Sequence, residues 1–187
     1  MEYISISMLN DFIFCPYSIY LHNVYMETDK DMYQAVPQIQ GTIAHTTVDN
    51  KTTNRAVADV VALPVFSEEL GVYGVIDTYK PKERLLVERK FKLSQIYQGQ
   101  IYQLWAQCFC MIEMGYVVDK LAFYESSKNL VHPIPFPTNK DKQTLLDFIE
   151  SFRKFDMSKK INISPNKCLH CIYCNLCDKT MSNNVYT

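Results

Sequence analysis

The order of helical and strand-like segments in this 187-residue chain predicts an α/β protein of the α+β kind, a mixed sheet flanked by helices. Strand-like runs rich in β-branched and aromatic residues are concentrated in the middle of the sequence, and segments with a helical period lie on both sides of them. Hydrophobic residues make up 48% of the chain and charged residues 21%, which is typical of a chain with one buried core. We therefore expect a single domain over residues 1–187.

The first part of the chain is expected to be helical. Apolar residues recur with a helical period from Ser7 to Val24, with Ser7 as the N-cap, and a second helix is expected from Gln38 to about Lys51. Three short runs then alternate as strands do, and the sequence Lys80-Pro81-Lys82 predicts a turn between the last two. These expected strands cover residues 56–66, 70–79 and 84–92.

The second part repeats this mixture of helix and strand. A helical period runs from Ile96 to Gly115, where the glycine is a suitable stop. Two more strands are expected at 117–125 and 130–136, followed by a last amphipathic helix near 139–155.

Charge and hydropathy narrow the expected location and partners. No apolar run approaches the ~20 residues that cross a bilayer, and the N-terminus lacks a signal-peptide pattern, so we expect no membrane partner and a cytoplasmic protein. The net charge is −1, so binding to phosphate would depend on a local patch. The best candidate is the basic run 80–92, which as charge alone is also consistent with a solvated hairpin.

Asp77, Glu88 and Lys90 form the first candidate site. Asp77 ends a strand-like run, expected at a sheet edge, and Glu88 and Lys90 are two apart, so their side chains share one face of the next strand. Carboxylates on neighbouring strands suit Mg²⁺ or Mn²⁺, and a lysine beside them can position water and stabilise developing negative charge. The set indicates phosphodiester hydrolysis, although the same pattern also occurs in ordinary hairpins.

Seven cysteines form the second feature, and four of them fall in the stretch KCLHCIYCNLC at 167–177. In a reducing compartment such clustering favours a metal or cluster over disulfides. Structural zinc, a wholly local cluster and a cluster completed by a distant thiol all remain open, and the x2 spacing is closest to that of iron–sulfur proteins. Cys108 and Cys110 are two apart on an expected helix and are interpreted as small buried hydrophobic residues.

Read in order, the motifs of this chain resemble those of RecB-like nucleases that carry an iron–sulfur cluster, and among them the CRISPR-associated Cas-four exonucleases most of all. The resemblance covers roughly residues 7–177. The motifs are Cys15-Pro16-x-x-x-Tyr20, Gly41-x-x-x-His45, Gly74-x-x-Asp77, Glu88-x-Lys90, Gln103 and the cysteine stretch.

The resemblance implies a restriction-endonuclease-like PD-(D/E)XK core and a role for each motif residue. His45, Asp77 and Glu88 would bind the catalytic Mn²⁺ or Mg²⁺. Lys90 would be the catalytic lysine, and Gln103 would orient the substrate or the attacking water.

The helix motif departs from the family pattern. The family has Q-x-x-x-Y on this helix, whereas Gln103 is followed four residues later by Gln107. A literal match runs from Gln98 to Tyr102, so this second assignment of the motif stays open.

The resemblance also implies a 4Fe–4S cluster that joins the two ends of the chain. Residues 1–26 and 160–178 would together form the iron–sulfur region, and Cys174 would be surplus. The expected ligands are Cys15, Cys168, Cys171 and Cys177.

By this resemblance the chain is expected to be an enzyme, a metal-dependent exonuclease acting on single-stranded ends of DNA. It would trim prespacers during CRISPR spacer acquisition, a form of antiviral defence, beside the CRISPR integrase proteins. Two alternatives are a non-catalytic subunit, stapled by iron–sulfur or zinc, that docks on DNA or an integrase, and a RecB-type repair nuclease.

Overall fold

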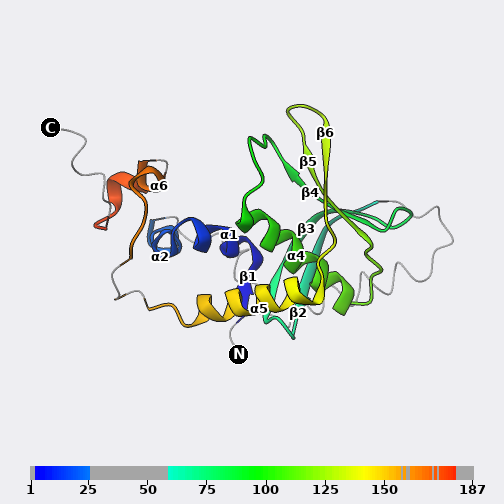
Figure 1. Ribbon diagram of the computed structural model, residues 1–187, viewed down its shortest axis with the longest axis horizontal. Helices are drawn as coiled ribbons and strands as arrows, with labels where there is room; N and C mark the ends of the chain where they lie inside the picture. The colour runs from blue at the N-terminus through cyan, green and yellow to red at the C-terminus, as the bar shows by residue number, and fades with distance from the viewer. Residues whose placement is uncertain are drawn as a thin grey trace.

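The structure, a computed structural model, describes residues 3–25, 59–156, 158, 161–169, 171 and 173–179. In these ranges the chain forms a six-stranded mixed sheet and five α-helices (Figure 1), which confirms the expected mixed α/β fold. The strands are β1 Ile4–Ser5, β2 Val60–Ser67, β3 Val72–Lys80, β4 Leu85–Lys90, β5 Lys120–Glu125 and β6 Leu130–Ile134. The helices are α1 Ile6–Phe14, α2 Pro16–Tyr25, α4 Gln98–Glu113, α5 Asn139–Arg153 and α6 Pro165–Leu169, followed by a 3₁₀ turn at Cys174–Leu176.

The sheet is organised around β3. Strand β2 pairs with it antiparallel along its whole length, from Ser67 opposite Val72 to Val60 opposite Tyr79. The other edge of β3 is shared, because β1 pairs with its first residues in parallel and β4 pairs with its last residues antiparallel. Beyond β4 the order continues with β5, parallel, and β6, antiparallel.

This arrangement corrects the expected position of Asp77. The strand was expected to emerge at a sheet edge there, but β3 has neighbours on both sides and continues to Lys80, one residue past the expected end at Tyr79. The expectation failed because a carboxylate in an alternating run was taken as the sign of a sheet edge. In the structure it lies inside the longest strand of the described sheet.

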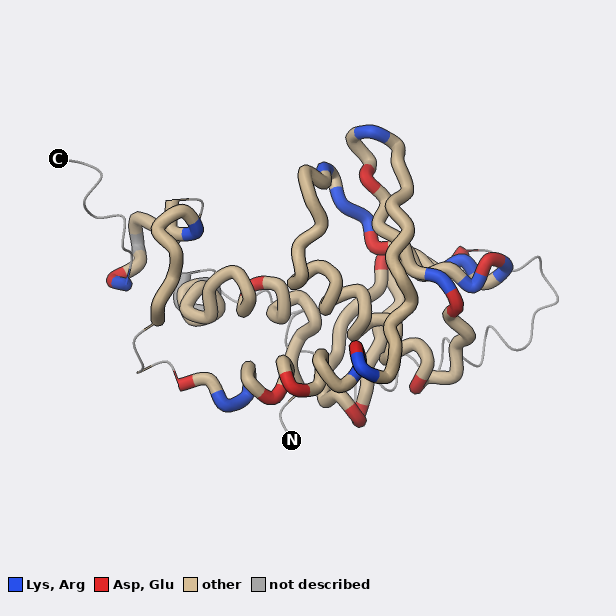
Figure 2. Tube along the Cα trace, viewed as in Figure 1, with Lys and Arg blue, Asp and Glu red and all other residues tan. Residues whose placement is uncertain are grey.

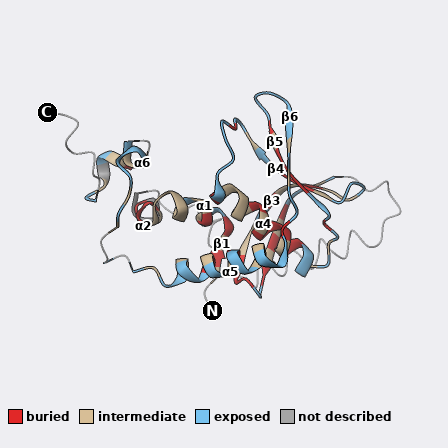
Figure 3. Cartoon of the chain, viewed as in Figure 1, coloured by how far each residue is buried: buried red, intermediate tan, exposed pale blue. Residues whose placement is uncertain are grey.

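The helices α1, α4 and α5 lie together on one side of the sheet and enclose the core (Figures 1 and 3). Leu104 and Met111 of α4 and Leu145 and Ile149 of α5 are fully buried. The start of α4 lies so close to α1 that a Cβ on Gly99 would lie 2.5 Å from the side-chain oxygen of Asn10. A glycine is therefore needed at this crossing, which fixes where α4 begins over the sheet.

The expected N-terminal helix from Ser7 to Val24 is in fact two helices. Cys15 has an extended backbone (φ −162°, ψ 115°), and α2 starts at Pro16. A proline disfavours the helical conformation in the residue before it, so the helix has to break at Cys15. Ser18 then donates its backbone N–H and its hydroxyl to the Cys15 carbonyl at 3.0 and 2.7 Å.

Strands β2 to β6 and helices α4 and α5 agree with expectation to within a few residues, whereas the short helix α6 and the 3₁₀ turn were not expected. Strand β1 was not expected, because two residues carry no period and depend on β3 for their pairing. The expected helix from Gln38 to Lys51, which includes His45, lies outside the described residues. No helix within the described ranges is both long and apolar enough to cross a membrane.

Candidate active site and cysteine pocket

Asp77 and Glu88 lie at the point where β4 separates from β3. The last ladder pair joins Thr78 to Val87, and Asp77 and Glu88 are the next residues on each strand. Past this pair the Asp77 carboxylate accepts a hydrogen bond from the backbone N–H of Arg89 at 2.7 Å. We call Asp77, Glu88 and Lys90 the carboxylate fork.

The other neighbour of Asp77 is also irregular. Ala62 of β2 lies opposite Asp77 between the pairs Val61–Thr78 and Leu63–Ile76, and its φ is +52°. A non-glycine residue in this left-handed region costs roughly 1–2 kcal/mol. Such strained positions are concentrated at functional sites, so the local backbone agrees with a site at Asp77.

The Glu88 carboxylate is almost fully buried, with 6% of its side chain exposed, and it is surrounded by donors. Its Oε1 accepts from the Lys90 ammonium at 2.9 Å and from the Gln103 amide at 3.0 Å. Its Oε2 accepts from the Gln107 amide at 2.9 Å. Burying a charge is costly unless it is paired and hydrogen-bonded, and these three donors satisfy that requirement.

Gln107 is the site residue that the sequence analysis missed. It is 1% exposed and also donates to the carbonyl of Val75 at 3.3 Å, so it connects α4 to both strands of the fork. A signal was present, because Gln103 and Gln107 are four residues apart and share one helix face. The side-chain oxygen of Gln107 is buried with no hydrogen-bond partner among the described residues.

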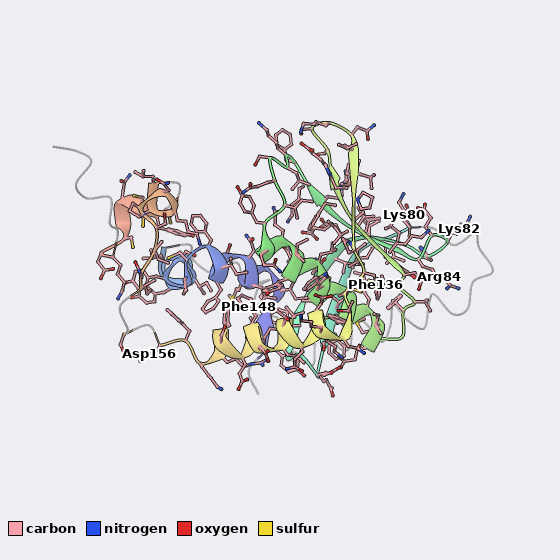
Figure 4. The ribbon with its side chains drawn as sticks, viewed as in Figure 1. Lys80, Lys82, Arg84, Phe136, Phe148 and Asp156 are labelled. Atoms are coloured by element: carbon pink, nitrogen blue, oxygen red, sulfur yellow. The ribbon has the colours of Figure 1, made fainter. Side chains whose placement is uncertain are left out.

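The same contacts favour Gln103 over the alternative pair Gln98 and Tyr102. Gln103 reaches Glu88, whereas the ring of Tyr102 packs against Phe148 of α5 at 4.8 Å and beside Trp105 at 5.7 Å. Figure 4 labels Phe148 on α5. Tyr102 therefore belongs to the contact between α4 and α5.

His45, the expected third metal ligand, lies outside the described residues. Within them, no three His, Cys, Asp or Glu side chains are close enough together to hold one metal ion. The carboxylate oxygens of Asp77 and Glu88 are nevertheless the hard donors that Mg²⁺ and Mn²⁺ prefer.

Five cysteines from the two ends of the described chain line one pocket, with an empty volume of about 300 Å³ that includes open solvent. Figure 4 shows sulfur atoms gathered between α2 and the C-terminal segment. Cys174 lines the same pocket, so its placement does not set it apart from the other four. The cysteine pocket comprises Cys15, Cys168, Cys171, Cys174 and Cys177.

Few buried side chains hold the C-terminal segment at this pocket. A small apolar cluster contains Tyr17, Leu21 and Tyr173, with Cys15, Cys171 and Cys177 packed against it. Lys167 donates to the carbonyl of Ile13 at 2.9 Å, near the end of α1, where a cation is favoured by the helix dipole. This cluster is separate from the main core, so the segment has little apolar packing of its own.

The pKa directions of the thiols agree with their positions. Burial raises the pKa of Cys171, and the nearby Cys15, Cys168 and Cys174 thiols raise it further. Burial alone raises the pKa of Cys108, on α4, to about 12. Cys108 and Cys110 are both fully buried in the main core, in agreement with their interpretation as small hydrophobic residues.

The basic residues of the run 80–92 lie in two groups at opposite ends of β4. At the β3–β4 turn, labelled by Lys80, Lys82 and Arg84 in Figure 4, Arg84 pairs with Asp119 at 3.0 Å. Arg89 and Lys90 lie at the other end of β4, at the fork, with Lys92 two residues beyond it. The run is therefore two basic groups, and only the second adjoins the candidate site.

Comparison with known proteins finds a likeness in structure and none in sequence. No protein-family model matches the chain, and no curated protein matches it in sequence. Its structure is similar to the solved crystal structure of SSO0001, with a TM-score of 0.56 and 16% sequence identity. The match covers 97% of this chain and 88% of that chain. At this identity the likeness supports the fold alone.

Proposed function

We propose that this protein is a metal-dependent DNA exonuclease that removes nucleotides from single-stranded ends. The observation that carries the proposal is the buried Glu88 carboxylate, held by Lys90, Gln103 and Gln107 beside Asp77 of the neighbouring strand. A structural ion pair would need only one of these donors. Three donors from two elements, converging on one acid where two strands separate, suit an acid that must keep one orientation for chemistry.

Asp77 and Glu88 would hold Mg²⁺ or Mn²⁺, together with His45 if the family pattern extends to it. Such an ion, when bound, supplies charge stabilisation at the scissile phosphate and makes water a better nucleophile. Lys90 has 25% of its side chain exposed, so its ammonium can also contact a phosphate oxygen while bonded to Glu88. Gln103 and Gln107 fix the Glu88 carboxylate in one orientation.

The cysteine pocket would hold a 4Fe–4S cluster through Cys15, Cys168, Cys171 and Cys177. The donor chemistry fits, because several thiols line one pocket whose walls also include Phe14 and Leu21. Thiolates are the ligands of such clusters, and the break at Pro16 is what brings Cys15 to the pocket.

The wider setting of the proposal comes from the family resemblance. A RecB-like core of the Cas-four type would process prespacers in the cytoplasm, with CRISPR integrase proteins as partners. The mixed sheet with helices on one face is consistent with such a core. The order of motifs from Cys15 to Cys177 supports a RecB-like nuclease with an iron–sulfur cluster, and a repair nuclease of that type stays the alternative.

Lys90→Ala tests the proposed function with Lys82→Ala as its matched control. We expect Lys90→Ala to lower Mn²⁺-dependent digestion of end-labelled single-stranded DNA by about 100-fold or more, since it removes the cation beside the phosphate. Lys82→Ala, in the exposed β3–β4 turn at the other end of β4 from the fork, should retain most of the rate. Equal rates for native protein and Lys90→Ala would refute the assigned site, and circular dichroism would confirm that both variants are folded.

A further inference from the structure

Phe91 directly follows Lys90 and is the most exposed large hydrophobic side chain in the described part of the chain, at 79%. A phenyl ring that is exposed to water lacks the stabilisation that burial provides. The high exposure of Phe91 therefore indicates a binding role. Phe91 is three residues from Glu88, and three extended residues span at most about 10 Å. The ring therefore lies within a few nucleotides' length of the carboxylate fork.

The backbone that carries Phe91 is held in place although its ring is exposed. The turn after β5 donates from the N–H of Ser127 to the Phe91 carbonyl and from the N–H of Ser126 to the Lys90 carbonyl, each at 2.9 Å. Two residues on, Leu93 is 6% exposed and anchors the segment in the core. An exposed ring on a fixed backbone loses little conformational freedom on binding.

Buried Glu125 strengthens this connection. It is fully buried, contacts the backbone of Leu93, and is bonded to Lys128 at 3.1 Å and to His132 at 3.1 Å. The tip of the β5–β6 hairpin and the segment after β4 are thus joined by both backbone and side-chain bonds. Figure 1 shows these two tips next to each other, beyond the helices.

The charges around Phe91 are basic. The local sequence is Arg89-Lys90-Phe91-Lys92, and Lys128 of the adjoining hairpin tip has 57% of its side chain exposed. Figure 2 shows Lys and Arg positions on both tips. An aromatic ring among cations matches a chain that alternates flat bases with phosphates, and a single strand offers unstacked bases whereas a duplex does not.

We propose that Phe91 is a stacking platform for a base of single-stranded DNA near the carboxylate fork, with Lys92 and Lys128 contacting the phosphates on either side. This inference rests on the proposed function and adds to it the residue on which a base of the DNA strand stacks. It makes the Lys90–Phe91 junction the boundary between the hydrolytic centre and the strand-binding surface. Bases beyond the scissile bond would be held without regard to sequence, because every base has a face that can stack.

The test measures binding in the Asp77→Asn background, in which hydrolysis is removed. Fluorescence anisotropy with labelled oligothymidylate compares Phe91→Ala with Phe136→Ala, an exposed phenylalanine (41%) that Figure 4 labels away from both tips. Loss of one stacked base should weaken binding about 5- to 150-fold for Phe91→Ala. Phe136→Ala should bind as the parent does.

Phe91→Trp supplies a second readout. It should retain affinity, and oligothymidylate should quench the fluorescence of the new indole, with the parent, whose one tryptophan is Trp105, as the baseline. Unchanged binding by Phe91→Ala, or no quenching in Phe91→Trp, would overturn the platform. Equal losses of single-stranded and duplex binding would overturn the stacking assignment, and tighter binding of oligouridylate would overturn the choice of DNA.

DNA binding by Phe91→Ala and DNA hydrolysis by the native protein test the platform and the nuclease separately. If the native protein digests DNA and Phe91→Ala binds normally, the platform is wrong and the nuclease stands. If Phe91→Ala loses binding but the native protein hydrolyses nothing with Mn²⁺, the platform stands and the nuclease is wrong. If the Asp77→Asn parent binds no nucleic acid, the platform is wrong.

Discussion

The carboxylate fork and the cysteine pocket are held by different means. At the fork the chain's own amides and a lysine fix the carboxylate of Glu88, on a sheet packed against the main core. At the cysteine pocket three buried side chains, Tyr17, Leu21 and Tyr173, form the apolar cluster. The difference indicates that the fork is preorganised by the fold, whereas the pocket depends on what its thiols bind.

The substitution expected to have the largest effect is Cys15→Ser, in the cysteine pocket. If the thiols share a cluster, Cys15→Ser opens a loop of about 150 residues, and the entropy model assigns about 5 kcal/mol to closing a loop of that size. We expect the variant to lose most of its iron and to unfold at a clearly lower temperature. Iron content and thermal unfolding measure both effects.

Two controls separate ligation from general damage. Cys108→Ala, in the main core, should lower stability and leave the iron content unchanged. Cys174→Ser should also retain iron, in contrast to Cys177→Ser. Two results would contradict this assignment: full iron content in Cys15→Ser, or loss of iron in Cys174→Ser while Cys15→Ser retains it. Either would show that the four clustered cysteines form the site without Cys15.

A smaller effect is expected at the fork from Gln107→Leu. This change removes the donor to Oε2 of Glu88 from a fully buried position, which should slow Mn²⁺-dependent hydrolysis about 10- to 100-fold. The free energy of unfolding should fall by about 1.5–3 kcal/mol, as for hydrogen bonds to charged groups. Gln98→Ala, at the exposed start of α4, is the control and should behave as native protein. A greater loss of rate in Gln98→Ala would reassign the helix motif.

The smallest effect concerns acid stability beside the fork. Burial by itself raises the pKa of Glu125, but hydrogen bonds from the Leu93 backbone, Lys128, His132 and Ser127 outweigh it and lower the pKa to about 2. A lowered folded pKa stabilises the protein above the ordinary value of 4.5, and this contribution is lost as the pH falls towards 2. Glu125→Gln should therefore lose less stability than native protein between pH 4.5 and 2, as followed by denaturant unfolding. If the stabilities of the two proteins fall in parallel between pH 4.5 and 2, Glu125 does not contribute to acid stability.

Much of this architecture could be predicted from periods and turn residues, because those signals are local. The strands that carry Asp77 and Glu88 and the turn between them were expected from alternation and from Lys80-Pro81-Lys82. The break at Cys15 was also readable, since Pro16 restricts the residue before it, but the helical period was given more weight.

The rest depends on tertiary contacts that no local pattern reports. The separation of β4 from β3 after Val87 arises from how strands share the edges of β3, and β1 exists only through its pairing there. Gln107 became a site residue because α4 crosses the sheet at Glu88, a crossing set by the close contact of Gly99 with Asn10. Its spacing from Gln103 was visible, but the direction of that helix face was not.

The metal content of anaerobically purified protein tests the contrast between the two regions most directly. Elemental analysis with an absorption spectrum should find four irons per chain, as a 4Fe–4S cluster requires, and a brown protein. Removal of that iron should release the C-terminal segment while the sheet stays folded, since the fork has its own hydrogen bonds. Stoichiometric zinc in place of iron, or a metal-free protein of unchanged stability, would contradict the account.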